Sequence, residues 1–185
     1  RQAFLDPESR IRLPGDRRDR SDTRVVGMQV VAGNFLDGIG VHFNNNLNCL
    51  IGGRGTGKSA ILETMRYVLD LPTFVRDRNP VDLVRHSLGS GGKGILYVDH
   101  KVEDASGRRR YRIERVFGHE PRVFNDRTGE ELDVKPRDLF LPDAPPEILG
   151  QKEIYEISQN PEIQLRLIDS ILGGFDQLER RESEI

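Results

Sequence analysis

Residues 47–59 read LNCLIGGRGTGKS, a short apolar run that leads into a glycine-rich loop. Residues 52–59 satisfy the pattern GxxxxGK[ST], for which a chance match in 185 residues has odds on the order of one percent. Glycines let the backbone curl so that successive N–H groups point inward at a phosphate. A helix that begins at the loop adds the positive end of its dipole. The stretch therefore predicts a phosphate-binding loop between a strand and a helix.

The residue types of this loop predict a nucleoside triphosphate and Mg²⁺ as its ligands. Lys58 supplies a mobile positive charge between the β- and γ-phosphates, and the Ser59 hydroxyl is a magnesium ligand. Arg54 could reach a phosphate, although a solvent-facing loop arginine is the simpler interpretation. We predict that Lys58 is catalytic and that the nucleotide contacts are Gly52, Gly53, Arg54, Gly55, Thr56, Gly57, Lys58, Ser59 and Ala60.

The segments on either side of the loop have the patterns that it requires. Residues 47–51 are almost continuously apolar, as in a buried central strand. After the loop, apolar residues recur at helical spacing and predict a helix with one buried face. The predicted buried face holds Ile61, Leu62, Met65, Val68 and Leu69, and the predicted exposed face holds Glu63, Thr64 and Arg66.

Further from the loop, β-branched and alternating runs predict strands at residues 25–31 and 38–43, before the apolar run. After the helix, residues 94–102 and 109–117 predict a hairpin, with a short helix at 81–86 before it. Helical spacing returns from Pro161 onward. Strands and helices thus alternate as in an α/β domain.

Composition excludes several classes of protein. Twenty-eight basic and 30 acidic residues leave a net charge of −2, which favours no partner by charge alone. Cys49 is the single cysteine, so an internal disulfide and a cysteine-based zinc site are excluded, and a reducing, cytoplasmic setting is expected. No apolar run approaches the roughly 18 residues of a membrane span, so no membrane association is expected.

Residues 46–63, NLNCLIGGRGTGKSAILE, resemble the start of an SMC-type ABC ATPase head. That group includes the structural-maintenance-of-chromosomes proteins, RecF, RecN and the double-strand-break repair ATPases. The resemblance covers about residues 24–172. It implies an α/β fold of the P-loop NTPase class, namely the N-terminal lobe of an ABC/SMC head with a mixed sheet, antiparallel β-hairpins and a phosphate-loop helix. The ligands it implies are ATP and Mg²⁺.

A second stretch, ILGQKEIYEI at residues 148–157, resembles the Q-loop of these heads. There a glutamine follows a strand and precedes a Glu-Ile run. The resemblance implies that Gln151 completes the Mg²⁺ shell, senses the γ-phosphate and acts with Lys58 in catalysis.

The second half of such a head is absent from the chain. SGGK at residues 90–93 imitates an ABC signature, and the strand-like run ending at Asp99 imitates a Walker B motif. A helix separates these motifs in ABC ATPases, whereas here only Gly94 does, so a glycine turn that feeds the hairpin is the better interpretation. We therefore expect a part of a longer protein, with an arginine-rich linker or arm at 1–24, the lobe at 25–172 and the start of a coiled-coil extension at 173–185.

The resemblance also implies partners. ATP would hold together two heads of a homodimer, and hydrolysis would separate them, with DNA or another nucleic acid as the target, as in DNA repair. Residues 1–12 resemble the segment that joins a PHP phosphoesterase domain to the ATPase in TrlF-type proteins. By itself the fragment is expected to bind nucleotide weakly and to hydrolyse it hardly at all.

Two other functions remain open at this stage. A self-contained P-loop kinase or phosphotransferase would need an aspartate base, for which Asp99, Asp138 and Asp143 are equal candidates. A non-catalytic interaction module would use the loop only as a fold element, although the intact Gly57-Lys58-Ser59 argues against it.

Overall fold

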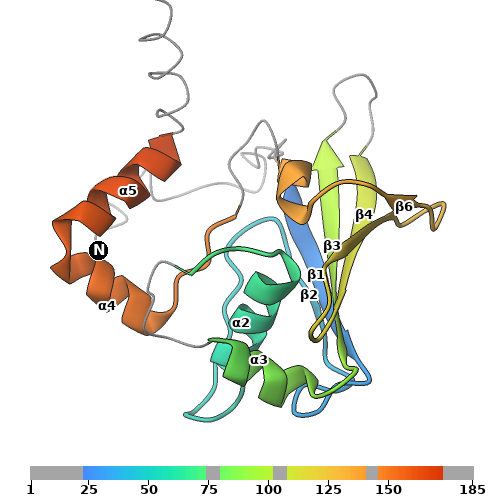
Figure 1. The fold of residues 1–185 in the computed structure, drawn as a ribbon, viewed down its shortest axis with the longest axis horizontal. Helices are drawn as coiled ribbons and strands as arrows, with labels where there is room; N and C mark the ends of the chain where they lie inside the picture. Colours follow the sequence, from blue (N-terminus) through green and yellow to red (C-terminus); the bar gives the residue numbers. More distant parts are fainter. Residues whose placement is uncertain (1–22, 74–79, 102–107, 141–145, 173–185) are drawn as a thin grey trace, which may run out of the picture.

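The computed structural model describes residues 23–73, 80–101, 108–140 and 146–172 as one antiparallel sheet with helices on one side (Figure 1). The strands are β1 (Arg24–Val31), β2 (Gly40–His42), β3 (Lys93–Lys101), β4 (Arg108–Val116), β5 (Arg122–Asn125) and β6 (Glu131–Leu132). Their order across the sheet is β2-β1-β3-β4-β5-β6. The helices are α2 (Lys58–Val68), α3 (Pro80–Leu88), α4 (Gln151–Gln159), α5 (Pro161–Leu172) and the 3-10 helix η3 (Pro136–Phe140).

The core lies between the sheet and helix α2. Because side chains alternate along a strand, β1, β3 and β4 each turn an apolar row toward α2, which contacts β3, β4 and α3. Helices α4 and α5 lie beyond α2, on the side away from the sheet (Figure 1). The fully buried core side chains include Met28, Val30, Val68, Leu96, Val98 and Ile113.

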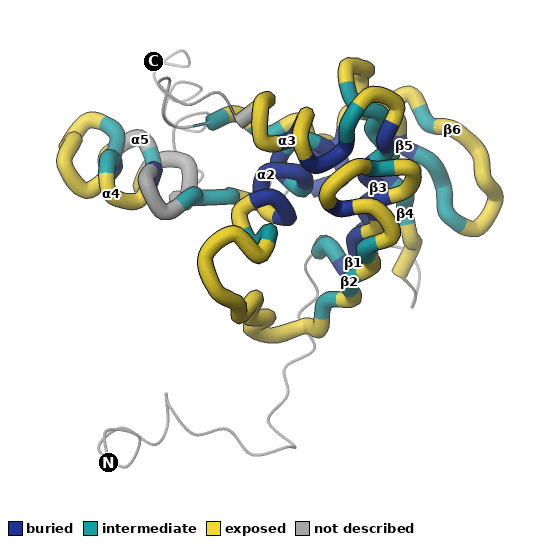
Figure 2. The backbone as a smooth tube through the Cα atoms, turned by 90° about the horizontal axis from the view of Figure 1, so that it is seen from below, coloured by how far each residue is buried: buried dark blue, intermediate teal, exposed yellow. Residues whose placement is uncertain are grey.

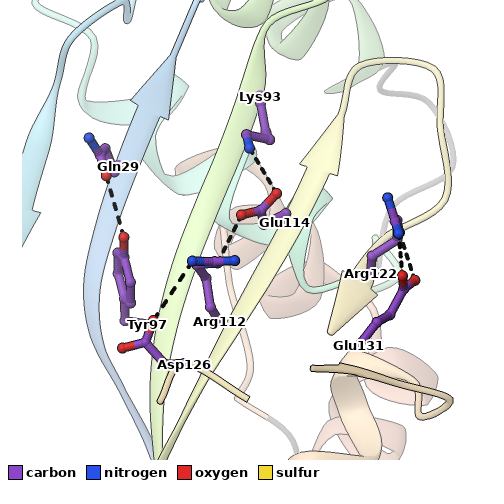
Figure 3. Close-up of polar contacts among 8 residues, drawn as sticks. All are labelled: Gln29, Lys93, Tyr97, Arg112, Glu114, Arg122, Asp126 and Glu131. Atoms are coloured by element: carbon purple, nitrogen blue, oxygen red, sulfur yellow. Dashed lines mark hydrogen bonds and ion pairs between the residues drawn. The ribbon is translucent and has the colours of Figure 1, made fainter. Parts of the chain in front are cut away.

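The opposite face of the sheet is polar and carries a row of ion pairs and hydrogen bonds (Figure 3). Such pairs between neighbouring strands support the register of a solvated face. The contacts are Gln29 with Tyr97, Lys93 with Glu114 (2.8 Å), Arg112 with Glu114 (2.8 Å), Arg112 with Asp126 (4.0 Å), and Arg122 with Glu131.

The predicted strands at 25–31 and 38–43, the hairpin, and the helices at 81–86 and from Pro161 are confirmed, with bounds shifted by a few residues. Strands β5 and β6 were not predicted, because they are short and lack a clear alternation.

The predicted buried strand at residues 47–51 is wrong for the described structure. This segment forms no ladder with any described strand, and its side chains are exposed. Figure 2 shows the tube in yellow along the connection from β2 to α2. The described sheet is antiparallel throughout, whereas a mixed sheet was predicted, and residues 47–51 add no strand to it.

The predicted linker at 1–24 and the extension at 173–185 lie outside the described residues, apart from Thr23 and Arg24, so both boundaries stay predictions. Among the described helices, none combines the length and apolarity needed to cross a membrane.

Candidate nucleotide-binding site

The phosphate loop has a backbone that only glycine adopts without strain at two positions. Gly55 and Gly57 have φ angles of 81° and 89°, in the left-handed region. The Thr56 hydroxyl donates a hydrogen bond to the Gly53 carbonyl (2.9 Å) and so closes the turn between them. The sequence Gly-Arg-Gly-Thr-Gly therefore produces a tight, exposed loop whose curvature is fixed by local contacts.

Lys58 reaches back over this loop. Its ammonium group donates hydrogen bonds to the carbonyls of Gly52 (2.6 Å) and Gly53 (2.5 Å) and lies 3.2 Å from the Thr56 hydroxyl. The two carbonyl groups thus hold the Lys58 ammonium beside the loop. From this position the ammonium can rotate toward a bound phosphate. This placement agrees with its predicted role as a point charge.

The N-terminus of α2 has backbone donors without helical acceptors. Gly57 is the N-cap and gives no side-chain capping bond, and the first helical bond runs from Ile61 N–H to the Gly57 carbonyl (2.9 Å). The amides of residues 58–60 therefore lack an intrahelical partner, as at every helix start. Together with the helix dipole they suit an anion such as the β-phosphate.

The other predicted contacts are placed as follows. Arg54 is exposed at the tip of the loop, and Ser59 is exposed in the first turn of α2. Ala60 is buried in the core, so only its amide can face a ligand. The Ser59 hydroxyl fits a magnesium ion that is held largely by phosphates and water, the usual arrangement for Mg²⁺. The described residues contain no cluster of His, Cys, Asp and Glu that could hold a metal by itself.

An aromatic ring, that of Phe35, flanks the loop. Phe35 is 50% exposed, and a Cβ added at Gly57 would lie 3.0 Å from its ring. The ring stacks on His86 with centroids 6.0 Å apart. The amides of Asn34 and Leu36 donate to the Ser87 carbonyl (3.1 and 3.2 Å), so the end of α3 anchors this segment beside the loop.

The largest difference from the sequence prediction lies on α2. Glu63, Thr64 and Arg66, predicted as the exposed face, are buried, whereas Leu62 from the predicted buried face is 37% exposed. Thr64 is buried where α2 crosses β3. Arg66 is buried because a carboxylate 87 residues further along the chain pairs with it, and Glu63 is buried beside Arg66.

That carboxylate belongs to Glu153 on α4. The Arg66 guanidinium donates to both of its oxygens (2.7 and 2.5 Å), and one of its amino groups also donates to the Ile148 carbonyl (2.7 Å). Glu63 lies 3.4 Å from Arg66 Nε. The hydrogen bonds to Glu153 raise the pKa of Arg66 above its usual value, although burial opposes the rise. This network was missed, because its partners lie 87 residues apart in the sequence.

Gln151 is the first residue of α4, so the predicted Q-loop position coincides with a helix start. The residues before it, 146–150, form no strand. The structure describes the backbone of Gln151 but not its side chain, and its role with Mg²⁺ stays a prediction.

The two segments that imitate ABC motifs, residues 90–93 and the run ending at Asp99, are parts of the sheet and its turn. Residues 89–92 form the predicted turn into β3, where a Cβ on Gly92 would lie 1.9 Å from the Leu88 carbonyl oxygen. Asp99 on β3 accepts a hydrogen bond from Arg110 (2.7 Å) and forms an ion pair with Arg24 on the neighbouring strand β1. These contacts lie at the end of the sheet remote from residues 34–36.

The aspartates proposed as a kinase base are not favoured by their contacts. Asp99 is committed to Arg110, and Asp138 accepts the Lys135 amide (3.1 Å) in η3. Asp143 lies outside the described residues.

A protein-family model described as an AAA domain matches residues 33–180, most of the chain. The chain belongs to the AAA-domain family. A search of curated proteins gives no match. Membership of this family supports the predicted ATP-binding lobe.

This AAA domain shares its fold with a solved structure. It is similar to an SMC ATPase studied for ATP-driven dimerisation and DNA-stimulated activation, with a TM-score of 0.54, 14% identity, and coverage of 80% of this chain and 98% of that one. It is also similar to the recombination mediator RecF with ATP, with a TM-score of 0.47 and 14% identity over 83% of this chain and 39% of that one. The first likeness confirms the predicted SMC-head fold. The link to a PHP domain receives no support from these matches.

Proposed function

We propose that this AAA domain is the ATP-binding lobe of an SMC-like ATPase, which hydrolyses ATP when a second half completes the head and two heads associate. The observation that carries the proposal is the combination of an intact phosphate loop with an unpaired apolar segment directly before it. Neither a stand-alone kinase nor a non-catalytic module accounts for that combination.

The unpaired segment supports completion by another part of the protein. Leu47 and Ile51 are 84% and 95% exposed, although both are large apolar residues. A segment that has exposed apolar side chains and no ladder with any described strand is a template for strand pairing. A strand laid beside residues 47–51 would bury these side chains and extend the sheet at the phosphate loop. In this proposal the Walker B strand of the missing half takes that position.

The division of labour follows from the described groups. The amides of the first turn of α2 bind the β-phosphate, and Lys58 turns from the loop carbonyls to bridge the β- and γ-phosphates. Ser59 and Gln151 hold Mg²⁺, which neutralises negative charge on the transferred phosphoryl group. Phe35 offers a face for the nucleobase beside the loop. The base that activates water comes from the missing half.

Association with a second head and with DNA is part of the proposal. Both properties are attributed to the SMC ATPase that shares the fold, and we extend them to this AAA domain. Its net charge of −2 gives no basic footprint of its own, so the DNA-facing surface would include other parts of the protein.

Calorimetry with ATPγS and Mg²⁺ tests nucleotide binding by the 185-residue chain. We expect weak binding that Lys58→Ala abolishes. The unfolding temperature should stay nearly unchanged, since the hydrogen bonds that Lys58 makes to described residues all lie within its own loop. Hydrolysis should be near zero until the second half of the head is added. Turnover of about 1 s⁻¹ by the isolated chain, abolished by Lys58→Ala, would contradict the need for completion. Phosphate transfer to small acceptors would favour the kinase. If ATPγS does not bind at all, the non-catalytic module would be favoured.

The nucleobase contact is tested by comparing ATP with inorganic triphosphate. Phe35→Ala should weaken ATP binding by about two- to tenfold, the range of one aromatic stacking contact, and leave triphosphate binding unchanged. Equal weakening of both ligands would show that Phe35 shapes the loop rather than binding the base.

A further inference from the structure

Three residues of α2 line up from the phosphate loop toward α4. Ser59, Glu63 and Arg66 are spaced i, i+4 and i+7, so they share one face of the helix. Ser59 lies in the first turn beside the loop, and Arg66 meets α4 about two turns further on. This face therefore connects the loop with the segment that contains Gln151.

Arg66 fastens this segment at points on both sides of Gln151. Its guanidinium donates to the Ile148 carbonyl (2.7 Å) before Gln151 and to both oxygens of Glu153 after it. The same Glu153 carboxylate accepts the Gly150 amide (2.6 Å), the N-cap of α4. The buried arginine thus holds the Ile148 carbonyl and the Glu153 carboxylate in place. The carboxylate in turn holds the Gly150 amide, at which the helix begins.

Stability alone does not account for this arrangement. Taking both charges out of water is costly, and an apolar pair of similar volume is often as stable as a buried ion pair. A guanidinium–carboxylate fork differs from an apolar contact because it fixes distance and orientation together. Helix α4 begins with Gln151, a proposed ligand of Mg²⁺ and sensor of the γ-phosphate. A fixed distance and orientation of this helix start would hold Gln151 at the phosphate loop.

We propose that Arg66 and Glu153 are positioning residues that set the start of helix α4, and with it Gln151, relative to the phosphate loop. The inference rests on the proposed function for the role of Gln151, but the placement of α4 is measurable without nucleotide.

Placement is tested with two spin labels in the 185-residue chain. The labels are attached at Leu62→Cys on α2 and Tyr155→Cys on α4, both exposed, in a Cys49→Ser background that removes the single native cysteine. Arg66→Lys keeps the charge but loses the fork, and Glu153→Gln keeps the shape but loses the charge. We expect a single narrow distance in the parent and a broadened distribution in both variants.

Hydrogen exchange gives a second measurement of the same placement. The amides of Gly150 and Ile154 should exchange at least tenfold faster in both variants, while β3 and β4 stay protected. Glu131→Gln, which breaks an exposed arginine–carboxylate pair on β5 and β6, is the matched control and should change neither measurement. Unaltered distances and exchange in Arg66→Lys and Glu153→Gln would overturn the proposal.

An apolar replacement separates positioning from stability. Arg66→Met combined with Glu153→Met and Glu63→Gln should remain folded, since the variant leaves none of the three charges of this cluster in the core. We expect its distance distribution to stay broad. In the head completed by its second half, on which all hydrolysis is measured, we expect the half-saturating Mg²⁺ concentration for ATP hydrolysis to rise at least fivefold. Recovery of both values in this variant would show that the pair only fills space, and would overturn the proposal.

A double-mutant comparison relates the pair to Gln151. If Glu153 acts through Gln151, adding Glu153→Gln to Gln151→Ala should lower the rate of hydrolysis no further, while additive losses would overturn this route of action. If Gln151→Ala by itself changes nothing, the proposed role of Gln151 fails. The label distances and exchange rates still decide whether the pair positions α4, so the two failures are distinguishable.

Discussion

Alanine substitutions at three glycines of the phosphate loop separate two costs that the structure assigns to different positions. A Cβ at Gly53 or Gly55 would meet no atom within 4 Å, but only Gly55 has a left-handed φ, of 81°. Gly57 combines a φ of 89° with a ring contact, because its added Cβ would lie 3.0 Å from Phe35. The series therefore runs from no cost, through backbone strain alone, to strain plus a steric contact.

The magnitudes follow from these geometries. Gly53→Ala should change the free energy of unfolding by less than about 0.5 kcal/mol. Gly55→Ala should lower it by about 1–2 kcal/mol, the cost of a left-handed L-residue. Gly57→Ala should lose a further ~0.5–1.5 kcal/mol, since the Phe35 ring must leave its preferred rotamer. For a chain of this size each kcal/mol lowers the unfolding temperature by roughly 2–4 °C.

Urea unfolding followed by circular dichroism measures the series, with the same variants in a Phe35→Ala background. Without the ring, Gly57→Ala should cost no more than Gly55→Ala. Equal stabilities of the Gly53→Ala and Gly57→Ala variants would refute the strain argument. An increment at Gly57 that persists without Phe35 would refute the steric argument.

Three further perturbations test other contacts of the AAA domain. Gly94→Ala places a Cβ 2.6 Å from Val68 Cγ2 and should lower the free energy of unfolding by about 1–3 kcal/mol. In a double-mutant cycle of urea unfolding, Val68→Ala should remove most of that loss. Additive losses would contradict the contact. Arg122→Met should raise the pKa of Glu131, which its hydrogen bonds to Arg122 now lower, in a carboxyl NMR titration. Since the folded-state pKa is the lower one, any stability from this pair is present at neutral pH and lost as the pH falls through that value. Asp99→Asn should cost about 1 kcal/mol of stability, because Asp99 pairs with half-exposed Arg110, and leave ATPγS affinity unchanged; a loss of affinity would return Asp99 to the site.

Local patterns determined much of this fold. The glycine spacing of the loop, the helical period after it and the alternation of the hairpin depend on residues within one or two turns of each other, so a sequence displays them directly. The phosphate loop, α2, β1, β3 and β4 were predicted for this reason. The position of Gln151 came instead from the resemblance, and only its place at a helix start is described.

Burial is what the tertiary structure decided. The run at residues 47–51 is apolar enough for a central strand, yet it is exposed because strand burial requires neighbours that the described chain does not supply. Arg66 is polar enough for a surface, yet it is 3% exposed because Glu153 neutralises and covers it from 87 residues away. Hydrophobicity and charge fix the cost of leaving water, but the partner that offsets this cost lies elsewhere in the sequence. Only the folded chain brings the two together.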